Sequence, residues 1–191
     1  YLKEKREIKG VVVKVTDGDT VRIRHVTSGH PASEFTGKFV EQSIAIRIAA
    51  VDSPEIAKGK STGQPYGQEA KDFTTSALMG RKVTIKLLSR DQYGRVLGLV
   101  RYRDNKILPN FLCGKKDISE QLLRKGLAVV YRSGGAQYDG SVERWNILEQ
   151  QAIRAKRGLW RNGAKKADLP AEYKRKSRKE TVSKKREFTQ V

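Results

Sequence analysis

The chain has 191 residues, of which 37% are hydrophobic, and its 40 Lys and Arg against 21 Asp and Glu give a formal net charge of +19. This length allows one domain with a buried core, and the charge favours a polyanionic partner, with a membrane surface as the alternative. The single Cys113 excludes an intramolecular disulfide and a zinc site built on cysteines, and His25 and His30 are too few for a His-rich metal site.

The first part of the chain predicts three β-strands. Ile8 to Val15 is rich in β-branched residues, and Thr20 to Val26 alternates apolar and basic residues with the period of a half-exposed strand. The Asp17-Gly18 dipeptide between these runs is a strong hairpin signal. A polar loop then extends from Thr27 to about Glu41, and Ser43 to Val51 predicts the third strand.

Helices and two further strands follow. Tyr66 to Met79 has apolar residues at helical spacing, with Gly80 as a plausible C-terminal cap. Val83–Leu88 and Val96–Tyr102 predict a hairpin joined by the turn at 91–95. A long connection from Tyr102 to Gln121 comes next.

The last part of the domain is helical. Leu122 to Val130 predicts a short helix and strand around Gly126, and Val142 to Arg157 is the longest helical pattern, ended by Gly158. Five short strands with helices inserted and appended indicate a small closed barrel of the α+β class.

The charge divides the chain into a domain over residues 1–160 and a basic C-terminal tail over 161–191. The tail holds 11 Lys and Arg against 4 Asp and Glu, a net charge of +7, and has few large apolar residues after Leu169. It therefore cannot form a core of its own. Two alternatives stay open: a helix from about Ala171 that lies along a phosphate backbone, or a disordered solubilising extension.

Acidic residues gather at two points in this basic chain. Asp17 and Asp19 flank Gly18 at the predicted hairpin turn, and Asp52 and Glu55 follow the third predicted strand. In a barrel these places can meet, which would bring three or four carboxylates around one point. A bound cation would relieve their repulsion, and oxygen-only ligands favour calcium or magnesium over zinc. Taken alone, the Asp-Gly-Asp sequence is also typical of an ordinary hairpin turn.

Two arginines stand out beside these acids. Arg47 interrupts an apolar strand, and a guanidinium buried there is costly unless it is paired. The alternative is an exposed arginine on a strand with one solvated face. Arg95 follows a Tyr-Gly turn and begins a strand. A glutamate base, two arginines and an oxygen-bound cation are together the parts that phosphodiester hydrolysis requires.

Six short motifs occur in one order along the chain. They are Asp17-Gly18-Asp19-Thr20, Arg47-Ile48-Ala49-Ala50-Val51-Asp52-Ser53-Pro54-Glu55, Tyr66-Gly67-Gln68-Glu69-Ala70, Asp91-Gln92-Tyr93-Gly94-Arg95, Gly126-Leu127-Ala128 and Gly158-Leu159-Trp160. Any one of them is weak, but six in order are highly specific. Over roughly residues 8–160, the chain resembles the staphylococcal nuclease-like (thermonuclease) family.

This resemblance implies a five-stranded OB-fold-type β-barrel with about three α-helices, and calcium (Ca2+) as the cofactor. The calcium-binding aspartates of the family fall on Asp19 and Asp52. A threonine that binds calcium through its backbone carbonyl falls on Ser53, and the change should be harmless because the main chain is the ligand.

The resemblance also implies calcium-dependent endonuclease cleavage of DNA and RNA, with little sequence specificity, leaving a 5′-hydroxyl and a 3′-phosphate. The catalytic base falls on Glu55, and the two phosphate-binding arginines fall on Arg47 and Arg95. Every catalytic position thus holds the family's own residue type, which argues against an inert copy. The competing hypothesis is a module that binds nucleic acid through the same barrel and tail without cutting it.

The expected partner is DNA or RNA, with no obligate protein partner, and we expect a monomer. The chain starts at Tyr1 and not at Met, as expected for a trimmed protein whose missing segment held a signal or an anchor. The longer loops resemble eukaryotic, membrane-anchored members of the family, fungal mitochondrial ones included, which predicts a mitochondrial or membrane-anchored location. The alternative is a secreted enzyme.

Overall fold

The computed structural model describes residues 6–27, 38, 40–59, 61–91, 93–103 and 114–177. Cys113, most of the predicted loop at 27–41, much of the connection at 102–121 and the tail beyond residue 177 lie outside the described residues.

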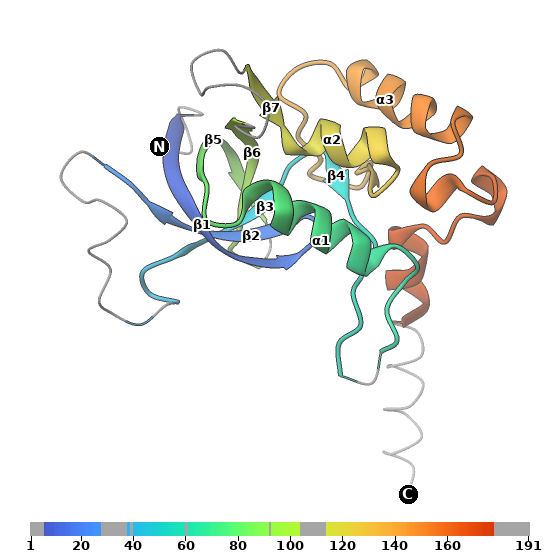
Figure 1. Ribbon diagram of the computed structural model, residues 1–191, viewed down its shortest axis with the longest axis horizontal. Coiled ribbons are helices and arrows are strands. Elements are labelled where there is room, and N and C mark those ends of the chain that lie inside the picture. Colours follow the sequence, from blue (N-terminus) through green and yellow to red (C-terminus); the bar gives the residue numbers. More distant parts are fainter. Residues whose placement is uncertain are drawn as a thin grey trace, which may run out of the picture.

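Five strands form a closed barrel. They are β1 (Glu7–Asp17), β2 (Thr20–His25), β3 (Ile44–Ile48), β5 (Lys82–Arg90) and β6 (Val96–Arg103). The sheet order is β3-β2-β1-β5-β6, and a parallel pairing of β3 with β6 closes the barrel (Figure 1). A short strand, β7 (Lys115–Asp117), pairs with the end of β6. The predicted α+β class and the five-stranded OB-fold-type barrel are therefore confirmed.

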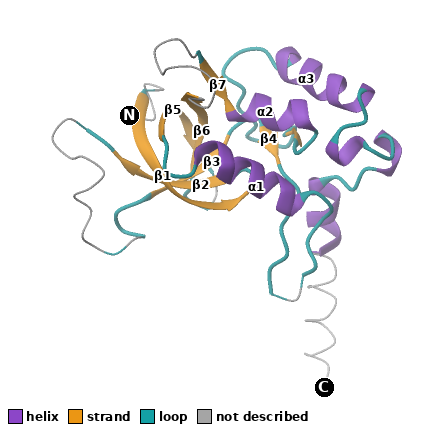
Figure 2. Cartoon of the chain, viewed as in Figure 1, coloured by secondary structure: helices purple, strands orange, loops and turns teal. Residues whose placement is uncertain are grey.

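Helices lie outside this barrel (Figure 2). They are α1 (Gly67–Leu78), α2 (Ile118–Lys125) and α3 (Glu143–Arg154), followed by a short helix over 170–177. The helix predicted to run to Arg157 ends at Arg154, because Lys156 turns the chain with a φ of 48°.

The predicted strand from Ser43 to Val51 is wrong in its last part. β3 ends at Ile48, and Ala50 adopts a φ of 68°, which turns the chain away from the barrel. Val51–Asp52 then form a separate strand, β4, which pairs with β8 (Val129–Val130). A left-handed alanine costs roughly 1 kcal/mol, and a hydrogen bond from Tyr131 N to Ala50 O at 2.9 Å holds the turn.

The connection predicted to extend from Tyr102 to Gln121 is also wrong at its end. Lys115–Asp117 form β7, and α2 begins at Ile118. Asp117 caps this helix by accepting a hydrogen bond from Ser119 N at 2.9 Å. This Asp-Ile-Ser sequence is a usual helix start that the apolar pattern alone does not reveal.

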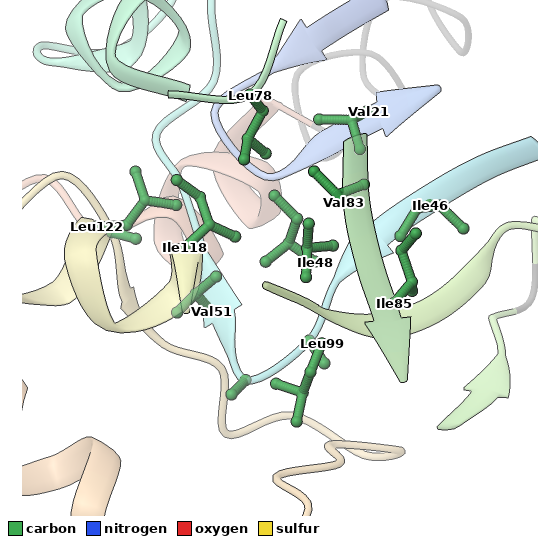
Figure 3. Packing of buried hydrophobic residues seen from close by; sticks show 14 of the residues in the cluster. Val21, Ile46, Ile48, Val51, Leu78, Val83, Ile85, Leu99, Ile118 and Leu122 are labelled. Carbon is green, nitrogen blue, oxygen red and sulfur yellow. The ribbon is translucent and has the colours of Figure 1, made fainter. Parts of the chain in front are cut away.

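One hydrophobic core fills the barrel and continues under the helices. Ile46, Ile48 and Ile85 are fully buried inside it, and Ile118 and Leu122 of α2 meet it beside Val51 (Figure 3). Within the described residues, no helix is long and apolar enough to cross a membrane.

A smaller cluster of buried residues holds the chain that follows α3. It consists of Val129, Ala152, Leu159 and Trp160, and Ala167 and Leu169 pack against it. Residues 167–177, which we call the C-terminal strap, thus begin on an apolar anchor. The strap then continues into the 170–177 helix, beside the loop between β4 and α1 (Figure 1).

Candidate active site

Arg47 joins two buried aspartates at one end of the barrel. Its Nη1 donates to Asp19 Oδ1, and its Nη2 donates to Asp52 Oδ1 at 2.6 Å. The Arg47 side chain is 13% exposed, and those of Asp19 and Asp52 are 2% and 4% exposed. The alternative of an exposed arginine on a half-wet strand therefore does not hold, and the guanidinium is buried because it is paired.

The β1–β2 turn brings Asp19 to this place. Asp19 follows Gly18, and a Cβ on Gly18 would lie 2.8 Å from the side chains of Ala70 and Ser53. Only glycine lets the turn approach α1 and the chain after β4 so closely. Ser53 N then donates to Asp19 Oδ2 at 2.8 Å, and Thr20 Oγ1 lies 3.1 Å from Asp19 Oδ1.

Glu55 lies three residues beyond Asp52, on the loop between β4 and α1. Its side chain is 31% exposed. Two hydrogen bonds with Gln64 fix its backbone: Glu55 N donates to Gln64 Oε1 at 3.0 Å, and Gln64 N donates to Glu55 O at 2.8 Å. Gly67 begins α1 against the same loop, since a Cβ there would meet Glu55 O at 2.4 Å.

The closure of the barrel places Arg95 near the same end. Arg47 pairs with Leu97 in the parallel β3–β6 ladder, so the turn before β6 lies beside β3. Arg95 Nε donates to Asp91 Oδ2 at 2.7 Å, and Arg95 Nη1 lies 3.4 Å from Thr20 Oγ1. Burial opposes ionisation of Asp91, but hydrogen bonds from Arg95 lower the pKa of this carboxyl below its ordinary value.

A cavity of about 630 Å³ opens next to these groups. Its lining includes Thr20, Arg22, Lys58, Arg90, Tyr93 and Arg95. The guanidinium of Arg95 lies 5.4 Å from the centre of the Tyr93 ring, and Tyr93 is 64% exposed. The cavity therefore combines cations with an aromatic face, a combination that is common in proteins that bind single-stranded nucleic acid.

We call the cluster of Arg47, Asp19 and Asp52 the centre, and burial determines its electrostatics. Burial raises the pKa of Asp19, although the charge of Arg47 acts in the opposite direction. Burial alone would lower the pKa of Arg47, but the charges of Asp19 and Asp52 raise it above its ordinary value. Arg47 is thus a permanent cation, and the negative charge of Asp19 is tolerated only because cations lie beside it.

A second cation reaches the centre from the C-terminal strap. Lys174 Nζ lies 2.7 Å from Asp52 Oδ1 and 3.1 Å from Glu55 Oε1. Burial would lower the pKa of Lys174, but the charge and hydrogen bond of Asp52 raise it. The sequence pattern did not indicate Lys174 or Gln64, because one lysine in a basic tail and one glutamine in a loop carry no periodic or motif signal.

The expected ring of three or four carboxylates around one point does not form. Among the described residues, no group of three or more His, Cys, Asp or Glu is arranged to hold a metal ion. Asp17 Oδ2 lies 3.6 Å from Lys58 Nζ, and the buried Asp17 Oδ1 has no hydrogen-bond partner among the residues that the structure describes. The carboxylates are instead linked in pairs by cations: Arg47 joins Asp19 to Asp52, and Lys174 joins Asp52 to Glu55.

The residues present still fit a hard cation. Asp19 supplies buried carboxylate oxygens from the β1–β2 turn, and Asp52 supplies them from β4. Ser53, next to Asp52, is also buried, and its backbone N donates to Asp19 Oδ2. Two carboxylates and a backbone carbonyl, completed by water, form an oxygen-only donor set of the kind that calcium accepts.

Comparison with known proteins assigns the chain to a family. The family model described as staphylococcal nuclease homologue matches residues 45–162. Endonuclease Htp3 of Saprolegnia parasitica is 39% identical over 175 residues, which are 91% of this chain and 79% of that protein. The probable endonuclease LCL3 of Schizophyllum commune is 39% identical over 186 residues, which are 92% of this chain but only 63% of that protein.

A third relative is more distant. The probable endonuclease LCL3 of Komagataella phaffii is 34% identical over 182 residues, which are 89% of this chain and 75% of that protein. The matched region contains Arg47, Asp52, Glu55 and Arg95, and the alignments with these relatives cover most of the chain. The chain therefore belongs to the family of staphylococcal nuclease homologues.

Proposed function

We propose that the protein is a calcium-dependent endonuclease that hydrolyses the phosphodiester bonds of DNA or RNA with little sequence specificity. The observation that carries this proposal is the ion-paired centre in which Arg47 joins Asp19 to Asp52, three residues before Glu55. The endonuclease names of the relatives support it, and so does the basic, aromatic cavity beside the centre.

Asp19, Asp52 and the backbone carbonyl of Ser53 would hold the calcium ion. When bound, the ion supplies positive charge beside the scissile phosphate and stabilises the charge that develops in the transition state. Burial keeps the two carboxylates in a low-dielectric surrounding, which strengthens their attraction to a divalent cation.

Arg47 and Arg95 would bind the phosphate oxygens. A guanidinium has five N–H donors in a planar fork, so each arginine can keep its carboxylate partner and still donate to phosphate. The pairing with Asp91 orients Arg95 on the wall of the cavity, and burial between Asp19 and Asp52 fixes Arg47. Groups fixed in advance need no reorganisation as the phosphate gains charge.

Glu55 would act as the general base. Its carboxylate is partly exposed, so water can reach it, and Gln64 holds its backbone in place. The base takes a proton from water, the water oxygen attacks phosphorus, and the bond to the 5′ oxygen breaks. The departing 5′ oxygen takes up a proton from solvent, which leaves a 5′-hydroxyl and a 3′-phosphate.

Glu55→Gln tests this assignment. We expect turnover on single-stranded DNA with calcium to fall by at least about 100-fold, because the base is lost, while affinity for DNA stays within about twofold, because the cations remain. Turnover comes from product formation, and affinity from binding in EDTA. Unchanged turnover in this variant, or in wild-type protein with EDTA, would falsify the proposal.

A second candidate function is binding of nucleic acid without cleavage, which the net charge of +19 supports equally well. Incubation of the wild-type protein with single-stranded DNA, in calcium and in EDTA, separates the two. A retarded but intact band under both conditions favours binding alone. In either case affinity should fall steeply with salt, because Lys and Arg contacts release counterions from the strand.

Location and assembly remain predictions. A mitochondrial or membrane-anchored location, or else secretion, and a monomeric state are proposed on the resemblance alone, and fractionation of cells and light scattering test them.

A further inference from the structure

The C-terminal strap lies across the loop that carries Glu55. Ala167 and Leu169 pack against the small apolar cluster below it, and Pro170 is buried. Gln64 Nε2 donates to Asp168 O at 3.0 Å, and Tyr173 and Ser61 share a hydrogen bond of 2.7 Å between their hydroxyl oxygens. The strap is thus anchored at several points before Lys174.

These anchors deliver the ammonium group of Lys174 to the centre. It lies 2.7 Å from Asp52 Oδ1 and 3.1 Å from Glu55 Oε1, and its side chain is 32% exposed. Asp52 Oδ1 therefore already faces two cations, since Arg47 Nη2 lies 2.6 Å from the same oxygen. Lys174 and Asp52 are 122 positions apart in the sequence, so only the fold brings them together.

We propose that the strap is an autoinhibitory device in which Lys174 occupies the place of the divalent cation and must be displaced before catalysis. This inference rests on the proposed function, because it takes Asp52 as a calcium ligand and Glu55 as the base. Lys174 engages both residues at once, so the docked strap neutralises a ligand and the base together.

Charge makes docking of Lys174 and binding of calcium compete. An ammonium and a divalent cation on the same carboxylate oxygen repel each other strongly at contact distance. The ammonium is partly solvated, so its ion pairs are weak enough to break and reform. Because the strap is tethered beside the centre, Lys174 acts at a high effective concentration and rebinds whenever the ion leaves.

This competition predicts how docking of the strap changes the apparent affinity for calcium. If calcium binds only when the strap is open, its apparent affinity is reduced by the fraction of molecules that are open. A strap that is docked about 90% of the time weakens calcium binding about tenfold. Because calcium and the docked strap exclude each other, saturating calcium must in turn hold the strap open.

Calorimetric titration of calcium into the full chain tests the device without a measurement of activity. We expect Lys174→Met, which keeps the length of the side chain and removes its charge, to bind calcium about tenfold more tightly than wild type. Lys176→Met is the matched control, because it removes the same charge from an exposed position on the same helix. Its calcium affinity should stay within about twofold of wild type. Equal or weaker binding by Lys174→Met overturns the proposal.

A second variant separates displacement of the strap from simple removal of charge. Tyr173→Phe breaks the hydrogen bond to Ser61 and leaves every charge in place. If docking of the strap weakens calcium binding, this variant binds calcium about two- to threefold more tightly than wild type. A hydrogen bond contributes about 1 kcal/mol to docking, and loss of part of this free energy corresponds to such a change. If the calcium affinity changes in Lys174→Met but not in Tyr173→Phe, the lysine charge alone explains the effect. The proposal that the strap is autoinhibitory is then wrong.

Cleavage of single-stranded DNA then distinguishes the two proposals. Lys174→Met should exceed wild-type activity at low calcium and equal it at saturating calcium. If Lys174 instead binds the substrate phosphate, the variant is slower even at saturating calcium, and autoinhibition is wrong. If neither protein cleaves DNA, the proposed nuclease function is wrong. The calcium titration still tests whether the strap competes with calcium.

Discussion

Buried aspartates lie near both ends of strand β6, and they are neutralised in different ways. Near its start, where Leu97 pairs with Arg47, Asp19 is held by an arginine 28 residues away. Near its end, where Arg101 pairs with Asp117, the aspartate accepts a hydrogen bond from Ser119 N only two residues away. The second arrangement is a helix cap, which stabilises α2 and needs no ligand.

The difference teaches that buried charge alone does not identify a functional site. Burial raises the pKa of both Asp19 and Asp117. The first, however, belongs to a set of charges brought together from four separate segments, with Arg47, Asp52 and Lys174. Such convergence is costly unless it serves a task, whereas a local cap stabilises the fold directly.

The largest expected effect is at the convergent end. Arg47→Lys and Arg95→Lys should each lower kcat/KM by about 100- to 1,000-fold, because an ammonium cannot replace the planar fork that holds two oxygens. Arg101→Lys at the other end should leave kcat/KM within about twofold. The measurement is cleavage of single-stranded DNA in calcium. If kcat/KM falls by less than tenfold in both Arg47→Lys and Arg95→Lys, the two ends of β6 do not differ in function.

A smaller effect appears at the capping end as a dependence on pH. Burial raises the pKa of Asp117 from the ordinary 3.8 to about 6. The folded protein therefore holds this proton more tightly than the unfolded chain. The stability that protonated Asp117 contributes is complete below about pH 4 and is lost as pH rises to about 6, which amounts to roughly 3 kcal/mol.

Asp117→Asn removes this dependence, because asparagine keeps the cap without the charge. Relative to wild type, the variant should gain stability between pH 4 and pH 7 and be nearly equal to it at pH 4. Urea denaturation at several pH values measures the gain. A constant difference across this range would contradict it.

The smallest effect concerns a buried glutamate that supports the fold. Glu149 on α3 accepts hydrogen bonds from Val130 N at 2.7 Å and from Arg132 Nη2 at 2.6 Å. Glu149→Gln should lower the free energy of unfolding by about 2 kcal/mol, because bonds to a charged acceptor are lost. Glu143→Gln, at an exposed position of the same helix, should cost less than about 1 kcal/mol. Equal losses in the two variants would show that burial of Glu149 contributes nothing.

Local patterns were enough to predict most elements of the barrel. The hairpin at Asp17-Gly18 and the helix at 67–78 follow from turn chemistry and apolar period, which act over a few residues. At the end of the third predicted strand, a distant contact decided the outcome. Ala50 is left-handed because the chain leaves the barrel to pair β4 with β8, and nothing within 43–51 signals that partner.

The sequence by itself determined the barrel class, the family and which side chains are candidates for chemistry, because strand period, turn residues and ordered motifs are all local properties. Only the tertiary structure decided that Arg47 lies buried between Asp19 and Asp52, that Asp17 pairs with Lys58, and that Lys174 reaches Asp52 across 122 residues. The reason is physical: the attraction between charges depends on their separation in space and on burial, and folding sets both.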